Sequence, residues 1–356
     1  MTLGSSHRLA AIFRSRGGRG SSLDRGWVLA LAAILVAEIL YFSLTVQGFF
    51  AGGSGLLSLT EQFLDIGTLA LGLSFVIFAG EIDLSVGAIA SLTGIVMAEL
   101  WKAGLEIWLA VAAAIAISAL IGAVNGLIIA LFRTNSLLVT LATQFIITST
   151  ATALGGGSPP FGFPQSLLSY AGTGTLGPVP AQLIVFAVLA VVVVVIVDRS
   201  RFGRALVLAG YNRDAARYTG IDVSRTVVGA FVLSGFFAGI AGIMISAFYN
   251  AARDDIGLSL LLPAVTVVVL GGVDIFGGRG RVAGVVVATF VLGFVTEGLL
   301  VGGHGSLTAT MVTGIVLLLC LVLKLQIDRH EGVSLGAELR RRLGDLFPSS
   351  VARSER

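Results

Sequence analysis

Long apolar stretches separated by short polar ones run along almost the whole chain. Most of them reach the roughly 20 residues that a helix needs to cross about 30 Å of hydrocarbon. The boundaries of 84–101 and of 258–271, which contains Pro263, are the least well defined by the pattern. The pattern predicts an all-α, polytopic membrane protein with about ten transmembrane helices, at 27–45, 62–79, 84–101, 107–132, 136–154, 181–197, 226–249, 258–271, 282–301 and 306–325.

Composition supports the same class. Of the 356 residues, 56% are hydrophobic and 12% are charged, against about 25% charged in ordinary soluble proteins. The apolar stretches leave no room for a separate soluble domain. We therefore expect a basic, disordered leader at 1–26, a transmembrane domain at 27–325 and a charged tail at 326–356.

The distribution of Lys and Arg predicts how the chain lies in the membrane. When the loops between the ten predicted helices are assigned alternately to two sides, 21 of the 23 Lys and Arg fall on one side. Lys and Arg concentrate in cytoplasmic loops. This predicts a multi-pass membrane protein with both termini and the loop 198–225 in the cytoplasm.

Two loops stand out from the rest. The range 198–225 is charged, compatible with helix and holds six of the basic residues, so it must lie in water, because Arg or Asp in mid-bilayer costs about 2.5 to 3.5 kcal/mol. On the opposite side, 155–180 has no charge and is rich in Gly and Pro. It is expected to be an ordered loop or a short re-entrant segment, and either a docking surface or a plain connector.

Carboxylates occur at a junction between two predicted helices, in the sequence GEIDLSVGAIASLTG at 80–94. Glu81 and Asp83 precede Ser85 at what we expect to be a helix start, where acids and hydroxyls cap free N–H groups. Acids near a membrane segment are also candidates for a pore or gating role. Capping and a place on a substrate path both remain open for these residues, and Asn125, in the fourth predicted helix, is a further path candidate.

A second stretch, LGGVDIFGGRGR at 270–281, is similar to the first. Gly80-x-Ile-Asp-Leu-x-x-Gly aligns with Gly271-x-Val-Asp-Ile-x-x-Gly at an offset of 191 residues, which hints at an internal repeat. Glycines spaced by four residues are expected to permit close helix packing, at Gly122 and Gly126, Gly235 and Gly239, and Gly280 and Gly284.

Glu297 lies in the middle of an apolar helix and needs a polar cavity or a partner there. Other acids in or near the spans are Glu38, Glu61, Asp65 and Glu99. A proton-coupled carrier uses acids of this kind, whereas hydrogen bonds between helices are the structural alternative.

The sequence excludes one class of function and argues against several others. The only two lysines, Lys102 and Lys324, are followed by Ala and Leu, so the GK[ST] of a phosphate-binding loop is absent. The single cysteine, Cys320, and three distant histidines make metal chemistry a poor interpretation. Enzymatic and nucleic-acid-binding functions fit equally badly.

Taken together, these stretches resemble the permease subunits of bacterial sugar ABC importers, of the ribose, xylose, arabinose and rhamnose branch that is related to branched-chain amino acid permeases. The resemblance covers about residues 60–325 and rests on four pieces in order: 80–94, NGLIIALFRTNSLLVTLAT at 125–143, GRALVLAGYNRDAARYTGIDV at 203–223, and 271–299. The sequence departs from such permeases at Asn135, where they often have proline, and at Leu261–Pro263, where they often have an acid.

The resemblance implies that the chain carries a monosaccharide or similar small polyol and does not itself catalyse a reaction. It also implies a dimer of like or related permease chains, two copies of an ATPase that bind ATP and Mg²⁺, and a periplasmic or lipid-anchored sugar-binding protein; the chain itself needs no cofactor. A cytoplasmic coupling helix would enter a groove of the ATPase, with the matching positions Gly203, Gly210, Asn212, Ala215, Ala216, Arg217, Tyr218, Gly220 and Ile221. Arg213, Asp214 and Arg217 could form ion pairs at the rim of that groove.

The substrate path would include Glu81, Asp83, Ser85, Asn125 and Glu297. The alternatives are a branched-chain amino acid permease of the same fold, a proton-coupled secondary carrier, and a purely structural membrane protein. The last of these leaves the loop 198–225 unexplained.

Overall fold

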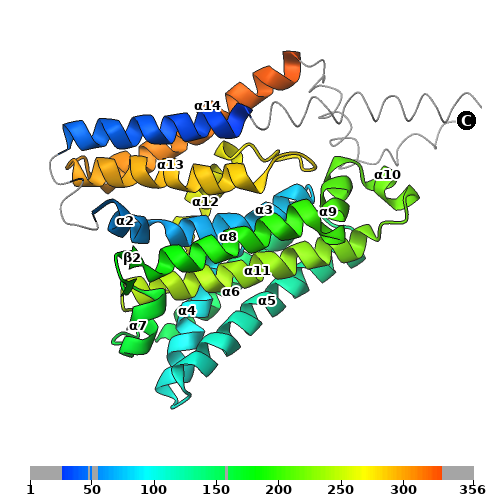
Figure 1. Ribbon diagram of the computed structural model, residues 1–356. Coiled ribbons are helices and arrows are strands. Elements are labelled where there is room, and N and C mark those ends of the chain that lie inside the picture. The colour runs from blue at the N-terminus through cyan, green and yellow to red at the C-terminus, as the bar shows by residue number, and fades with distance from the viewer. Residues whose placement is uncertain (1–25, 47–48, 50–54, 157–158, 331–356) are drawn as a thin grey trace, which may run out of the picture.

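The computed structural model describes residues 26–46, 49, 55–156 and 159–330 (Figure 1). The predicted leader, except for its last residue, and the part of the predicted tail beyond His330 lie outside this range. The elements in chain order are the N-terminal helix Gly26–Thr45, α2 Gly55–Leu59, the 3-10 helix η1 Thr60–Gln62, α3 Leu64–Phe78, α4 Val86–Lys102, α5 Ile107–Phe132, α6 Ser136–Gly155, α7 Gln165–Ala171, β1 Thr175–Leu176, β2 Val179–Pro180, α8 Ala181–Arg199, α9 Arg201–Tyr211, α10 Arg213–Tyr218, α11 Val223–Phe248, α12 Leu258–Leu270, α13 Val282–Val301 and α14 Gly305–His330.

Each of the ten predicted apolar ranges is helical, which confirms the all-α membrane architecture. Among the described residues, six helices are long and apolar enough to cross a bilayer, and a seventh span results if α2, η1 and α3 are counted as one span with a 54° bend. The 13 residues of α12 and the 17 of α4 rise only about 20 and 25 Å at 1.5 Å per residue. These two predicted spans are therefore shorter than the hydrocarbon is thick.

The α4 helix is short because it begins inside the bundle. Its N-cap, Ser85, accepts a hydrogen bond from Asn125, which lies seven residues before the end of α5. At 1.5 Å per residue, α4 therefore starts about 10 Å inward from that end of α5. The segment 79–85 between α3 and α4 is a break within the bundle rather than an external turn, and we call it the α3–α4 break.

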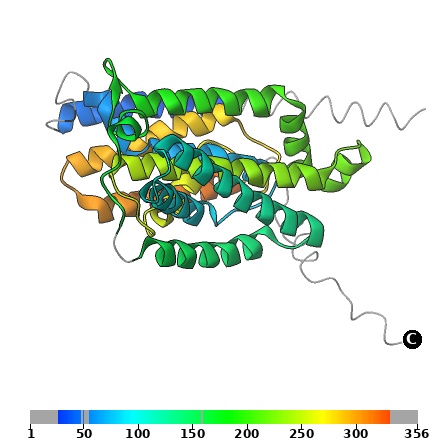
Figure 2. The ribbon, with the colours of Figure 1, turned by 90° about the horizontal axis from the view of Figure 1, so that it is seen from below.

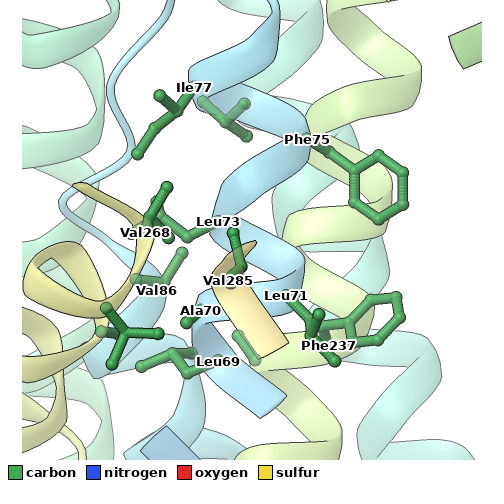
Figure 3. Close-up of a cluster of buried hydrophobic side chains, with 14 of the residues drawn as sticks. Leu69, Ala70, Leu71, Leu73, Phe75, Ile77, Val86, Phe237, Val268 and Val285 are labelled. Atoms are coloured by element: carbon green, nitrogen blue, oxygen red, sulfur yellow. The ribbon is translucent and has the colours of Figure 1, made fainter. Parts of the chain in front are cut away.

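The helix α3 is the centre of the packed core. It is apolar on all sides, a pattern typical of a helix that is surrounded by others. Figure 3 shows Leu71 and Phe75 of α3 near Phe237 of α11, while Val268 of α12 and Val285 of α13 lie close to the same helix. Because nearly all of α3 is buried, its position is fixed by helices from both halves of the chain.

The helices α5 and α11 cross at the glycines that the sequence predicted to pack. A Cβ on Gly122 would collide with the backbone oxygen of Phe231, and one on Gly126 would lie 2.8 Å from the Cα of Val228. On the facing helix, a Cβ on Gly235 would lie 3.2 Å from the Cα of Gly122. The prediction of close packing at these small residues is confirmed.

The two ends of the bundle differ. The start of the N-terminal helix, the end of α14, and α9 with α10 lie at one end, which we call the α10 end (Figure 1). The α9 helix turns sharply away from α8 and runs across this end (Figure 2). At the other end, the α7 end, the loop 155–180 forms α7 and the antiparallel hairpin β1–β2, so the expected order of this loop is confirmed for its described residues.

Candidate functional site

Two loops and the last turn of α9, which are far apart in sequence, meet at the α10 end and contact each other through glycine backbones. A Cβ on Gly277 would lie 2.5 Å from the Cα of Gly80 and 3.1 Å from the Cα of Gly210. A Cβ on Gly210 would collide with the backbone oxygen of Phe78, which accepts a 3.0 Å hydrogen bond from the N–H of Gly278. We call Gly80, Gly210, Gly277 and Gly278 the glycine junction. It joins the α3–α4 break, the last turn of α9, and the loop between α12 and α13.

The α3–α4 break and the loop between α12 and α13 have similar local structure, as the suspected repeat would require. Both α3 and α12 end in the same capping pattern, with positive φ at Gly80 (72°) and at Gly272 (83°). Asp83 then accepts a hydrogen bond from the N–H two residues later, and Asp274 does the same. The glycine equivalent to Gly80 is thus Gly272 rather than Gly271. The offset of 191 holds at the aspartates and is 192 at the helix ends, because the second loop is one residue shorter.

Glu81 forms an ion pair with Arg213 of the same chain. Its carboxylate accepts a hydrogen bond from the guanidinium of Arg213, the first residue of α10. The side chain of Glu81 is 7% exposed, whereas that of Arg213 is 47% exposed. The pair borders a cavity of about 30 Å³, which Arg217 and apolar groups of α5 and α11 also line. A cavity of this size has room for one water and none for a sugar.

Asp83 and Ser85 are fully buried and are joined in a hydrogen-bond network. One carboxylate oxygen of Asp83 accepts hydrogen bonds from the N–H and hydroxyl of Ser85 at 3.0 and 2.6 Å. The other oxygen accepts from the hydroxyl of Ser234 in α11 at 3.0 Å. Asn125 donates to the Ser85 hydroxyl at 3.0 Å and accepts from Thr143 in α6 at 2.7 Å.

The backbone of the α3–α4 break is held by α6. The N–H of Ile82 donates to the Ser136 hydroxyl and that of Leu84 donates to the Thr140 hydroxyl, each at 3.1 Å. Sequence reasoning missed these two side chains, together with Thr143 and Ser234, because hydroxyls are common in membrane helices. The only available signal was that Ser136 and Thr140 are four residues apart and so share one face of a helix.

The structure brings four of the five predicted path residues together and separates the fifth. Asp83, Ser85 and Asn125 lie in one buried network, and Glu81 is two residues from Asp83. Glu297, in α13, lies apart from this network, close enough to Asp65 of α3 for the two carboxylates to interact electrostatically. Asp83 accepts a hydrogen bond from the N–H of Ser85, the residue just before α4, and α4 itself has no side-chain cap.

The predicted ATPase-coupling residues divide into a buried and an exposed group. Ala216 is 1% exposed and belongs to the chain's own core, and Gly203 and Gly210 pack against backbone of the same chain. Asn212 caps α10 by accepting hydrogen bonds from the N–H groups of Asp214 and Ala215, both at 3.0 Å. Ile221 is half-buried. The exposed predicted residues are Ala215, Arg217, Tyr218 and Gly220.

The small residues of α10 differ in their exposure. Only Ala215 is both small and exposed on α10, whereas Ala216 points into its own chain. Tyr218 is 93% exposed, which is unusual for an aromatic side chain without a partner to cover it. Arg213, expected at the rim of a partner's groove, forms an ion pair with Glu81 of its own chain. Arg217 lies 3.6 Å from Asp214 on the same helix.

At the α7 end, the segment that follows α11 is tied to neighbouring elements. Arg253 forms two hydrogen bonds with Asp255, at 3.0 and 2.7 Å, which lower the pKa of that carboxyl. Asp254 accepts a 2.5 Å hydrogen bond from Thr152 near the end of α6. In the part of the chain that the structure describes, no group of three or more His, Cys, Asp or Glu side chains is placed to hold a metal ion.

Comparison with known proteins decides the class to which this arrangement belongs. Residues 55–321 match the family described as branched-chain amino acid transport system / permease component. The chain belongs to this family. The matched range includes all three segments of the glycine junction, whereas the N-terminal helix lies outside it.

Individual relatives align with this chain over most of their length. The chain is 33% identical over 312 residues to the autoinducer 2 import system permease protein LsrD of Yersinia enterocolitica, and the match covers 86% of this chain and 94% of that protein. It is 32% identical over 303 residues to LsrD of Escherichia coli K12 and of Shigella flexneri, covering 83% of this chain and 91% of each relative. The chain is thus a permease subunit of an ABC importer, the transport component of such a system rather than an enzyme, and the predicted family is confirmed.

Proposed function

We propose that this permease moves a monosaccharide or similar small polyol across the bacterial inner membrane, driven by ATP hydrolysis in a separate ATPase subunit that docks on α10. The observation that carries the proposal is the glycine junction, where the segment that resembles a coupling helix contacts the α3–α4 break directly. A push on α10 from outside the chain is thereby placed next to the α3–α4 break. There the buried carboxylate of Asp83 accepts a hydrogen bond from α11, while side chains of α5 and α6 bond to Ser85 and to the N–H of Leu84.

The proposed orientation puts the α10 end in the cytoplasm. The start of the N-terminal helix, the end of α14 and α10 all lie at this end, in agreement with the alternation that assigned 21 of 23 Lys and Arg to one side (Figure 1). The α7 end then faces outward, where a binding protein would deliver the cargo. The uncharged surface of the loop 155–180 suits such a contact.

We further propose that the transport path forms between two permease chains. Three polar residues of α6, Gln144, Thr148 and Thr152, follow each other at intervals of four and so line one face. All three are half-buried or exposed in the single chain. Polar side chains at membrane depth face protein or water rather than lipid. Amide and hydroxyl groups on this face suit a neutral solute with several hydroxyls, and a second chain opposite would enclose them.

The identity of the relatives supports a sugar-like cargo, because LsrD is described as a permease for autoinducer 2 import. A branched-chain amino acid is the second candidate, since it appears in the description of the family. The two cargoes differ in charge and in hydroxyl content, so an uptake assay separates them.

The test uses proteoliposomes that contain the permease with the ATPase and binding protein encoded by neighbouring genes. Uptake of radiolabelled ribose, autoinducer 2 and leucine is measured with ATP supplied to the ATPase. We expect uptake of a sugar-like solute that stops when the ATPase lacks the lysine of its phosphate-binding loop. Uptake of leucine alone would favour the second candidate, and uptake driven by a pH gradient through the permease without its ATPase would overturn the proposal.

A further inference from the structure

The short helix α10 depends on the rest of the chain for its position. It has six residues, far fewer than the roughly 12 to 15 that an isolated helix needs for stability in water. Three contacts hold it: its Asn212 cap, the buried Ala216, and the Arg213 side chain that reaches Glu81. The Arg213 side chain connects α10 to a segment 132 residues away.

Glu81 occupies the point where α3 passes into the α3–α4 break. Its N–H completes the cap of α3 by donating to the backbone oxygen of Val76 at 3.1 Å. The next N–H, that of Ile82, is held by α6, and the Asp83 network follows. A displacement of the Glu81 carboxylate therefore acts on the end of α3 and on the start of the break at the same time.

The opposite charges of Glu81 and Arg213 make it unfavourable to separate the two side chains. The Glu81 side chain is almost entirely buried, so its carboxylate has little water to replace Arg213. Separating a buried charge from its partner is strongly unfavourable, whereas a pair in water contributes little. Hence α10 cannot move away from the break without either carrying Glu81 along or leaving it unpaired.

We propose that Glu81 and Arg213 are positioning residues that tie α10 to the α3–α4 break, so that movement of α10 is transmitted to the Asp83 network. Neither residue contacts the cargo in this role. Glu81, expected from the sequence to line the substrate path, belongs instead to the transmission of motion. The inference rests on the proposed function, because it requires that an ATPase moves α10.

The experiment compares uptake per ATP hydrolysed in the reconstituted importer, with the cargo found above as the transported probe. The variants are Glu81→Gln, Arg213→Gln, both together, and Arg213→Lys, which keeps the positive charge. Arg225→Gln is the matched control, since Arg225 is 90% exposed and pairs only with Asp222 three residues earlier among the described residues. Melting temperatures and the amount of ATPase that co-purifies are measured for every variant.

We expect each Gln variant to lower uptake per ATP by about fivefold or more while ATPase binding stays unchanged. The double variant is expected to be no worse than the worse single variant, because both remove the same connection. Arg213→Lys should recover at least part of the ratio, and Arg225→Gln should match the wild type.

If the wild-type importer works, two outcomes overturn the inference and leave the proposed function standing. In the first, the single variants transport as much per ATP as Arg225→Gln. In the second, the losses of the two single variants add up in the double variant. A loss of uptake that simply follows a loss of folded protein or of bound ATPase also overturns it, because the pair would then serve stability or docking. Absence of ATP-driven uptake in the wild type would instead overturn the proposed function itself.

Discussion

Replacement of Asp83 by Ala tests whether the carboxylate holds the α3–α4 break together. The change removes an acceptor that serves three donors: the N–H of Ser85, the Ser85 hydroxyl and the Ser234 hydroxyl. Each donor is buried and would lose its partner. At about 1 kcal/mol for each hydrogen bond, the free energy of unfolding should fall by about 3 kcal/mol, and more if the donors find no water.

Two further substitutions grade the effect. Ser234→Ala removes one of the three bonds and should lower the free energy of unfolding by about 1 kcal/mol. In Asp83→Asn the side-chain oxygen can still accept from Ser85, and the amide can donate to the Ser234 hydroxyl, so the loss should stay below about 1 kcal/mol. Asp214→Ala is the control, because the Asp214 side chain is 70% exposed and its sole ion pair among the described residues is a long one, 3.6 Å to Arg217. The free energy of unfolding of this variant should lie within about 0.5 kcal/mol of the wild type.

The assay is unfolding in mixed micelles with increasing denaturing detergent, followed by far-UV circular dichroism. The reasoning is refuted if Asp83→Ala unfolds within about 1 kcal/mol of the wild type. It is also refuted if Asp83→Asn is as damaging as Asp83→Ala, since the negative charge rather than the hydrogen-bond geometry would then be what the site requires.

Three other predictions follow from the packing. Gly210→Ala should destabilise the protein by about 1 to 3 kcal/mol, because a Cβ there would lie 2.7 Å from a backbone nitrogen of the neighbouring loop; Gly314→Ala, with nothing within 4 Å, should not, and equal melting temperatures for the two variants would contradict the glycine junction. Ala215→Glu should leave the melting temperature unchanged and weaken co-purification of the ATPase, whereas Ala216→Glu should reduce the yield of folded protein by burying a charge; the reverse pattern would show that α10 is turned the other way. Trp27→Phe should lower the free energy of unfolding by about 1 kcal/mol through loss of the 2.8 Å bond to the last carbonyl of α12, and unchanged stability in the detergent titration would remove that anchor of the N-terminal helix.

The sequence by itself determined the elements, because the bilayer imposes a requirement on each span separately. A segment in hydrocarbon must be apolar and must satisfy its backbone within a helix, whatever its neighbours are. All ten predicted ranges are accordingly helical. Spacing also predicted the close approach at Gly122 and Gly235, since a residue without a side chain is needed wherever two helix backbones touch.

The limits of α4 could not be read from hydropathy. An apolar stretch that follows Asp83 has the composition of a full span, yet the helix begins about 10 Å inside the bundle. What sets that depth is the position of hydroxyl and amide groups on α5, α6 and α11, which hydropathy does not resolve.

Only the tertiary structure decided what the polar residues do. Glu81 and Asp83 are two residues apart and looked alike in the sequence, but one pairs with Arg213 and the other accepts from Ser234, partners 132 and 151 residues away. Ala215 and Ala216 are adjacent and chemically identical, and the rotation of α10 exposes the first and buries the second. The hydrophobicity of a segment depends on its own residues and can be read from the sequence. The hydrogen bonds and ion pairs between distant segments depend on which segments folding brings together.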